Sequence, residues 1–219
     1  MNYKKSASIL LILFLVSCSS TMKRPQAGNI RRLSFDTLVQ SLQNQPPMRI
    51  GFDVDDTVLF SSPGFYYGMN KYSPGSAKFM AMDTFWVEMN NRLDQFSIPK
   101  DIARRLIKFH QERGDTIYFI TARPATPTER LTETLTKTFN LKHPNKVVFT
   151  GFKRGENYKI APIKRLHIRL FYGDSDSDIE AAQANGARAI RIMRAGNTTY
   201  KPLPDYGNLG EEVLQDSQF

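Results

Sequence analysis

Strand-like and helix-like segments alternate along most of this chain, and the alternation leaves few folds open to it. Runs rich in β-branched and aromatic residues, such as TIYFIT at residues 116–121, are separated by segments whose apolar residues recur every three or four positions. The predicted strands cover residues 48–53, 116–121, 146–150, 168–172 and 187–193, and the predicted helices cover residues 34–45, 97–113, 128–139, 158–166 and 178–185. Parallel strands joined by helical crossovers account for this order. The sequence therefore predicts an α/β fold, with helices on both faces of a mostly parallel sheet.

Clusters of aspartates follow two of the predicted strands. The first cluster is DVDDT at residues 53–57, and the second is GDSDSD at residues 173–178. The carboxyl ends of parallel strands meet at one edge of a sheet, where ligands of such folds bind. Carboxylates brought together there raise one another's pKa unless a cation neutralises them. Because the clusters offer oxygen ligands without paired histidines, they predict Mg²⁺ rather than zinc.

Individual aspartates in these clusters have simpler interpretations. For Asp56 and Asp176 taken alone, capping of the next helix is the favoured interpretation. The second cluster also matches the first three ligand positions of an EF-hand calcium loop. Ile179 and Asn185, however, stand where that loop needs Gly and Glu, so the EF-hand interpretation fails.

Composition narrows the class of protein further. A chain of 219 residues is long enough for one domain with a sizeable core, and its single cysteine excludes both a disulfide framework and a zinc site built on several cysteines. The formal net charge of +9 favours an acidic partner. Lys and Arg occur as scattered pairs rather than as one stripe, so nucleic acid is not the expected partner.

The N-terminal segment is typical of an export signal. Two lysines at positions 4 and 5 precede an apolar run at residues 9–16, which is much shorter than the roughly 20 residues of a membrane-spanning helix. The run ends in LVSC, which resembles a bacterial lipobox, so residues 1–17 are the expected signal peptide and Cys18 the expected site of a lipid. Ser19 then resembles a sorting signal for the outer membrane. Ordinary cleavage a few residues later, which would release a soluble periplasmic protein, is the alternative.

Residues 18–33 are polar and basic, and we expect them to form a linker or lipid tether, with the folded domain at residues 34–219. Within that linker, Cys18 and Arg24 have the C-x5-R spacing of the tyrosine phosphatase loop. That loop needs a preceding strand and a helix N-terminus to bind phosphate, and neither is predicted here. A thiolate phosphatase is therefore not expected.

Five motifs together carry a resemblance to a known family. They are FDVDDTVLFSSPGF at residues 52–65, ITAR at 120–123, NYK at 157–159, FYGDSDSDI at 171–179 and NTTYKPLP at 197–204. Their order and intervals resemble those of the bacterial class B acid phosphatases of the haloacid dehalogenase (HAD) superfamily. The resemblance implies a HAD-like Rossmannoid fold, a phosphomonoesterase and a homotetramer. Class C acid phosphatases, which are commonly lipoproteins, share the Asp motifs, but FSSPGF and NTTYKPLP argue against them.

The resemblance implies a role for several aspartates of these motifs. Asp53 is the expected nucleophile, which forms an aspartyl-phosphate, and Asp55 is the expected general acid and then general base. The expected ligands of Mg²⁺ are Asp53, the backbone carbonyl of Asp55, and Asp174. Asp178 is expected to orient the metal's water ligands and Lys159.

The same resemblance implies the residues that bind the phosphoryl group. Thr121 would offer its hydroxyl and Ala122 its backbone N–H, while Lys159 would neutralise charge and Arg123 would contact the substrate. Ala122 departs from the family, which commonly has Gly there. A small effect on the flexibility of this loop is the expected consequence.

Residues 60–96 form an insert that contains nine aromatic residues. The resemblance makes this insert a cap over the active site, in which Phe65 and Tyr200 would sandwich an aromatic leaving group beside Trp86, Phe79 and Met80. At least half of the aromatic residues are expected to pack the cap or a subunit interface instead. Nucleotides and aryl phosphates are thus the expected substrates, with transfer of phosphate to alcohols as a further activity. A non-enzymatic anion-binding lipoprotein is the remaining alternative, but it leaves the order of the Asp motifs unexplained.

Overall fold

A computed structural model describes residues 30–153 and 155–219 of the chain. The expected signal peptide, the lipid site at Cys18 and the pairing of Cys18 with Arg24 all lie outside these described residues. Within the described part, none of the helices is both long and apolar enough to cross a membrane.

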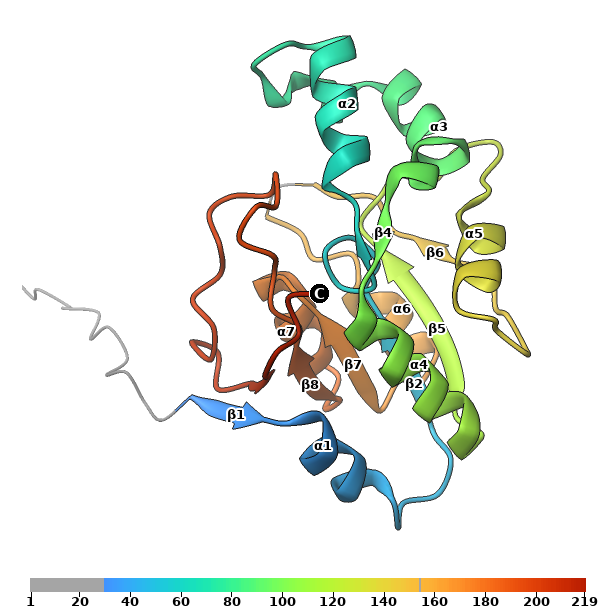
Figure 1. Cartoon of the computed structure of the whole chain (residues 1–219), viewed down its shortest axis with the longest axis vertical. Coiled ribbons are helices and arrows are strands. Elements are labelled where there is room, and N and C mark those ends of the chain that lie inside the picture. The colour runs from blue at the N-terminus through green and yellow to red at the C-terminus, as the bar shows by residue number, and fades with distance from the viewer. Residues whose placement is uncertain (1–29, 154) are drawn as a thin grey trace, which may run out of the picture.

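A parallel sheet of seven strands forms the centre of the molecule (Figure 1). In spatial order its strands are β1 (Arg31–Leu33), β9 (Glu212–Leu214), β8 (Arg188–Arg191), β7 (Leu170–Gly173), β2 (Arg49–Phe52), β5 (Thr116–Thr121) and β6 (Val148–Phe149). Every neighbouring pair in this sheet is parallel, as the sequence predicted. Because β2 lies between β5 and β7, the segment after β2 has a neighbouring strand end on each side.

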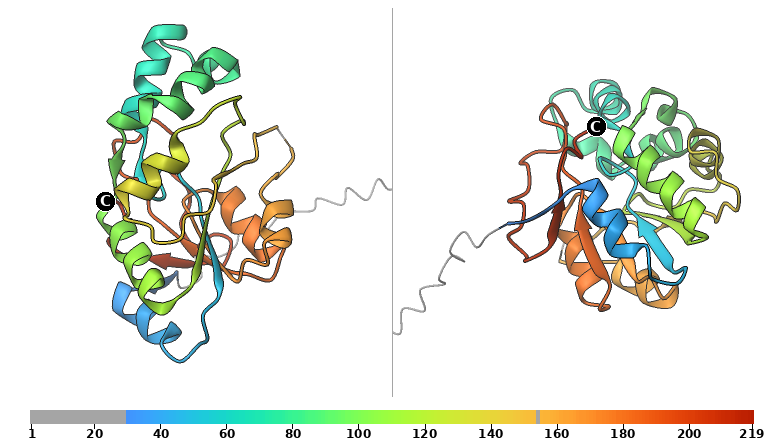
Figure 2. Two further views of the ribbon diagram at one scale, coloured as in Figure 1. Left: turned by 90° about the vertical axis from the view of Figure 1, so that its right-hand side faces the viewer. Right: turned by 60° about the horizontal axis from the view of Figure 1, so that its bottom comes forward.

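Helices cover both faces of the sheet (Figure 2). One face carries α1 (Phe35–Leu42), α4 (Asp101–Arg113) and α5 (Leu131–Thr138), and the other carries α6 (Ile160–Arg165) and α7 (Asp176–Gln183). Strand β7 shows how alternation serves both layers, because Leu170 and Tyr172 pack with the first group of helices while Phe171 packs with the second. Both faces are thus buried, which confirms the predicted fold class.

The insert between β2 and β5 builds a separate small lobe at the carboxyl end of the sheet (Figure 1). It contains α2 (Ser62–Tyr72), η1 (Ala77–Ala81), α3 (Asp83–Asn91) and η2 (Leu93–Phe96), and its base is the antiparallel pair β3 (Leu59–Phe60) and β4 (Ile98–Pro99). Its own core consists of Phe79, Phe85, Trp86, Met89 and Leu93, against which Phe65 and Tyr72 pack. Five of the insert's nine aromatic residues therefore pack this lobe, as expected for at least half of them.

Several elements differ from the sequence prediction, most clearly at three places. Residues 31–33, assigned to the linker, form the edge strand β1, so the fold begins before Ser34. The predicted helix at 97–113 begins at Asp101, because Ile98 and Pro99 pair with β3. Strand β9 was not predicted at all. These short strands have little pattern of their own and depend on partners that are distant in the sequence.

Candidate active site

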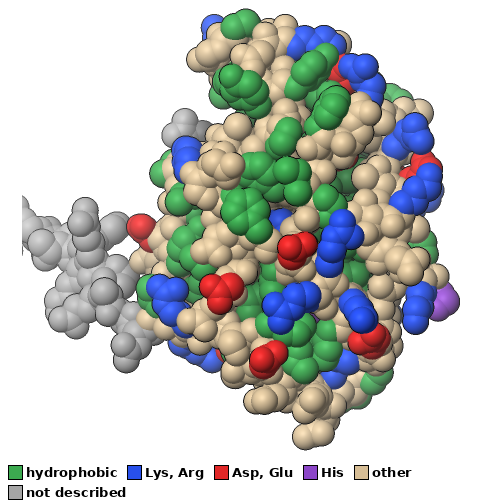
Figure 3. Space-filling model, in the orientation of Figure 1, with side chains coloured by type: hydrophobic (Ala, Val, Ile, Leu, Met, Phe, Trp, Pro, Cys, Tyr) green, Lys and Arg blue, Asp and Glu red, His purple; other side chains and the backbone are tan. Residues whose placement is uncertain are grey.

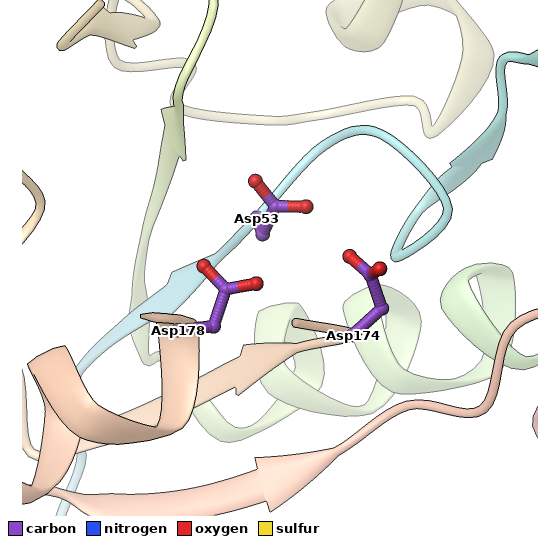
Figure 4. Close-up of side chains that lie close together, drawn as sticks. All are labelled: Asp53, Asp174 and Asp178. Atoms are coloured by element: carbon purple, nitrogen blue, oxygen red, sulfur yellow. The ribbon is translucent and has the colours of Figure 1, made fainter. Parts of the chain in front are cut away.

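The two Asp clusters meet because their strands are neighbours. Asp53 directly follows β2 and Asp174 directly follows β7, and the backbone N–H of Asp53 donates to the carbonyl of Tyr172 over 2.9 Å. Figure 4 shows the side chains of Asp53, Asp174 and Asp178 directed toward one another. One carboxylate oxygen from each of the three lies within 4.8 Å of the other two. The predicted meeting of the clusters at one edge of the sheet is therefore present.

Helix α7 brings the third carboxylate into this group. Ser175 caps the helix, and its backbone N–H and hydroxyl donate to Asp178 Oδ2 over 3.1 and 2.7 Å. The other oxygen of Asp178 faces the site. A Cβ atom on Gly173 would lie 2.2 Å from the Cβ of Asp178, so only glycine allows this approach. The GDSDSD sequence thus encodes both a helix cap and a site residue.

Lys159 is the buried cation of the site. Its side chain forms ion pairs with Asp53 and with Asp178, the latter at 2.6 Å, and only 4% of the residue is exposed. Burial raises the pKa of Asp53 well above its usual value; Lys159 opposes this increase, whereas Asp178 and Asp174 add to it. Although burial acts against its charge, Asp178 and Asp53 hold the pKa of Lys159 above the usual value.

Two residues that the sequence analysis missed also bind these carboxylates. The hydroxyl of Thr57 donates to Asp53 Oδ2 over 3.1 Å and to Asp174 Oδ1 over 3.0 Å. Arg194 forms an ion pair with Asp174. Thr57 belongs to the first Asp motif and could have been found there, whereas Arg194 follows β8 without any local signal.

The donor set of this site fits a hard divalent cation. Asp53, Asp174 and Asp178 are all buried and supply only carboxylate oxygens. Three carboxylates this close together repel one another unless a positive charge is present; burial raises the pKa of Asp53 most, and Asp178 and Asp174 add to the increase. The three side chains could therefore hold a metal ion.

A second charged group surrounds Asp55. Arg123 donates to Asp55 from Nε over 2.9 Å and from Nη2 over 2.6 Å, and it also pairs with Asp94 at 2.6 Å. Burial alone would raise the pKa of Asp55, but the Arg123 guanidinium holds it below its usual value. The hydroxyl of Thr121 lies 3.4 Å from Asp55 Oδ2 and accepts the backbone N–H of Arg123. Asp94 comes from the inserted lobe, and no sequence pattern linked it to Arg123.

A cavity of about 770 Å³ opens over these groups, between the sheet and the inserted lobe. Most of the residues proposed from the sequence line it: Asp53, Asp55, Phe65, Trp86, Ala122, Arg123, Lys159, Asp174, Asp178 and Tyr200. Phe79 and Met80 also line it, whereas Thr121 is buried behind the lining. The cavity is therefore lined both by charged groups and by aromatic side chains.

The interpretation of Asp56 as a helix cap is wrong. Asp56 has a φ of +58° and precedes no helix, and its carboxylate accepts a hydrogen bond from the Thr198 hydroxyl over 2.5 Å. Burial raises the pKa of Asp56 to about 6. Asp176 does not cap α7 either, because Ser175 is the cap; Asp176 lies in the first turn of this helix and pairs with Arg191 at 2.7 Å.

Charged side chains on the molecular surface show no single basic stripe on the face that Figure 3 displays. Lys and Arg are spread over this face, with Asp and Glu among them. The distribution agrees with the scattered basic pairs in the sequence.

A parallel sheet with a lobe inserted after its first central strand, and with aspartates after β2 and β7, is the arrangement of the hydrolases of the HAD superfamily. Comparison with known protein families gives the same superfamily. The family model described as HAD superfamily, subfamily IIIB (acid phosphatase), matches residues 26–203. The chain belongs to this family, the class B acid phosphatases, and is a phosphomonoesterase.

Individual relatives support the same assignment. A class B acid phosphatase of Salmonella arizonae is 48% identical over 214 residues, covering 94% of this chain and 90% of the relative. One from Citrobacter rodentium is 46% identical over 221 residues, covering 100% of this chain and 93% of the relative. Among solved structures, a hydrolase from Pseudomonas syringae is similar in fold, with a TM-score of 0.50 at 15% identity, covering 78% of this chain and 94% of its own.

Proposed function

We propose that phosphomonoesters bind with their phosphoryl group beside the charged residues of the cavity and that Asp53 is the nucleophile. The position of the Asp53 carboxylate carries this proposal. The carboxylate lines the cavity beside Lys159, and Asp53 follows β2, which lies between β5 and β7. An oxygen of Asp53 forms a bond to phosphorus as the bond to the leaving oxygen breaks, which gives an aspartyl-phosphate. Water then attacks phosphorus and releases inorganic phosphate and the free carboxylate.

Mg²⁺ is the ion that we propose for the carboxylate group. Asp53 and Asp174, with the backbone carbonyl of Asp55, would hold it, and Asp178 would orient its surroundings. When bound, the ion supplies positive charge that stabilises the phosphoryl oxygens in the transition state. Lys159 adds a second positive charge that is already in place.

Arg123 and Asp55 form an ion pair that the substrate would break: the phosphoryl oxygens take the place of Asp55 as the partner of Arg123. Phosphoryl oxygens entering the cavity compete with Asp55 for the guanidinium of Arg123, which lines the cavity. Once released from Arg123, Asp55 can carry a proton to the leaving oxygen, and its carboxylate can later accept a proton from water. Thr121 and the backbone N–H of Ala122 complete the proposed phosphate site.

The aromatic lining of the cavity favours leaving groups with rings. Phe65, Trp86 and Tyr200 line it, and ring stacking there suits nucleotides and aryl phosphates. An alcohol admitted in place of water would accept the phosphoryl group, so phosphotransfer to alcohols is part of the proposal.

Localisation and assembly complete the proposal. The N-terminal sequence supports export to the periplasm, with a lipid on Cys18 as the finer proposal, and the family resemblance supports a homotetramer. Mass spectrometry of the mature N-terminus tests the lipid. Light scattering of the purified protein tests the tetramer.

Turnover of a nucleotide and an aryl phosphate by Asp53→Asn tests the nucleophile. We expect the rate to fall at least about a thousandfold, because the amide is not nucleophilic. Asp205→Asn is the matched control, since Asp205 is exposed and outside the cavity lining. Substantial turnover by Asp53→Asn would refute the assignment of the nucleophile. Activity that persists in EDTA without added Mg²⁺ would refute the metal.

A further inference from the structure

Tyr200 has an exposed ring on a firmly held backbone. Its side chain lines the cavity, although 58% of the residue is exposed. The backbone N–H of Tyr200 donates to the Thr198 hydroxyl over 3.1 Å, and its carbonyl accepts from Arg194 over 3.3 Å. The guanidinium of Arg194 also lies 4.0 Å from the centre of the Tyr200 ring. An aromatic ring held open to solvent at the rim of a cavity is ready to stack on a ligand.

The Thr198 hydroxyl is where three segments of the chain meet. It donates to Asp56 Oδ2 over 2.5 Å, and it accepts from Ser62 Oγ over 3.2 Å as well as from the N–H of Tyr200. Ser62 Oγ in turn accepts the backbone N–H of Thr199 over 2.8 Å. We call Asp56, Ser62 and Thr198 the hydroxyl junction; all three residues are buried.

Each segment of the hydroxyl junction contributes to a different part of the site. Asp56 directly follows Asp55, and Ser62 begins α2, which carries Phe65 into the cavity. Thr198 lies two residues before Tyr200. The junction therefore ties the two proposed stacking rings to the loop that carries the catalytic carboxylates.

We propose that Thr198 is a positioning residue that sets the enzyme's preference for aromatic phosphomonoesters by holding Tyr200 in its stacking position. This inference rests on the proposed stacking of substrate rings on Tyr200. Preorganisation gives the reason, because a ring that is already placed loses less conformational entropy when the substrate binds. Asp56 Oδ1 has no hydrogen-bond partner among the described residues. Within that part of the chain, the Thr198 hydroxyl is therefore the hydrogen-bond donor to the Asp56 side chain.

Steady-state kinetics with two substrates test the proposal. Phenyl phosphate has a ring to stack and glycerol 2-phosphate has none, so the ratio of their kcat/KM values measures aromatic preference. Thr198→Val removes the hydroxyl but keeps the branched shape, and Thr198→Ser keeps the hydroxyl. Thr116→Val is the matched control, since Thr116 is exposed and begins strand β5, whereas the site residue Thr121 ends it. Thermal unfolding by circular dichroism checks that each variant is folded.

We expect Tyr200→Ala to lower the ratio about tenfold and Thr198→Val to lower it about fivefold, the sizes of one stacked ring and one hydrogen bond. Thr198→Ser and Thr116→Val keep the wild-type ratio. If Thr198 acts through Tyr200, the double variant has the ratio of Tyr200→Ala alone.

Other outcomes overturn the proposal in distinguishable ways. An unchanged ratio in Tyr200→Ala would remove the proposed stacking itself, and the present inference with it. A lowered ratio in Tyr200→Ala but not in Thr198→Val would overturn only the role of Thr198. The role of Thr198 is also overturned if the double variant lowers the kcat/KM ratio by the product of the two factors seen in Tyr200→Ala and Thr198→Val, because the two residues would then act independently. Should Thr198→Val not fold, Ser62→Ala and Thr198→Ser decide the question, because a lowered ratio in Ser62→Ala alone supports the junction and unchanged ratios in both reject it.

Discussion

Replacing Asp56 with Asn should stabilise the folded protein at neutral pH. Asp56 is buried, and burial raises the pKa of its carboxyl to about 6 from an ordinary value of 3.8. Below pH 3.8 the carboxyl is protonated in both the folded and the unfolded chain, so it costs no stability. Between pH 3.8 and about pH 6 the unfolded chain has released this proton while the folded chain still holds it. Stability is therefore lost as the pH rises from the unfolded-state pKa to the folded-state pKa, and the loss is complete above about pH 6.

The size of this loss follows from the two pKa values. One pH unit of difference corresponds to about 1.4 kcal/mol. The difference between about 6 and 3.8 thus costs the folded state about 3 kcal/mol at pH 7 and above. Asn cannot ionise, so Asp56→Asn escapes this cost. Its amide still offers an oxygen that accepts the hydrogen bond from Thr198.

Urea unfolding followed by circular dichroism measures the effect. The free energy of unfolding of wild type and Asp56→Asn is compared from pH 4 to pH 8 in EDTA. We expect the advantage of the variant to grow by about 2 kcal/mol between pH 4 and pH 7, since part of the cost is already present at pH 4. A difference that does not change with pH would refute the reasoning, whatever its size. Asp205→Asn, which changes an exposed carboxylate, is the control and should show no such growth. Saturating Mg²⁺ should reduce the effect, because Asp174 contributes to the raised pKa.

Three further predictions concern stability. Asp94→Asn removes one partner of the buried Arg123 guanidinium and should cost at least about 2 kcal/mol in urea unfolding at pH 7, with the exposed Asp83→Asn as control. Gly68→Ala would place a Cβ 2.2 Å from the Phe85 ring, and should lower stability by about 1–3 kcal/mol in the same assay. Mg²⁺ at about a hundred times its dissociation constant should stabilise the metal-free protein by about 2.7 kcal/mol, measured as a rise in Tm; an unchanged Tm would contradict a metal site at Asp53, Asp174 and Asp178.

Most of the sheet was predictable because its central strands carry their own signal. Residues 116–121 were predicted as a strand with the bounds that β5 has, since a buried central strand is apolar and β-branched. The edge strand β1 and its neighbour β9 were missed. Each is three residues long and contains charged residues, and β1 gains its strand conformation by pairing with β9, about 180 residues away in sequence.

The site likewise contains residues that local sequence patterns predict and residues that they do not. Asp53 and Asp174 were predictable as neighbours because each follows a recognisable strand, and Asp178 follows from the cap of α7. The contacts of Arg194 with Asp174, of Asp94 with Arg123 and of Thr198 with Asp56 were not predicted. Arg194, Asp94 and Thr198 each approach from a loop or from the inserted lobe, where no periodic pattern reports on the partner. The catalytic roles themselves remain predictions for the kinetic experiments.

The order of strands and helices predicted the fold class of this protein, and the resemblance of its five motifs predicted the phosphomonoesterase family. Local patterns suffice for this, because strand periodicity and motif residues are written in consecutive positions. The charge balance of the site needed the folded chain. The buried cations that offset the carboxylates are Lys159, Arg123 and Arg194, and two of them pair with acidic partners more than 60 residues away. The conformation of Asp56 and the hydroxyl junction likewise exist only because packing brings distant segments together in a space that excludes water.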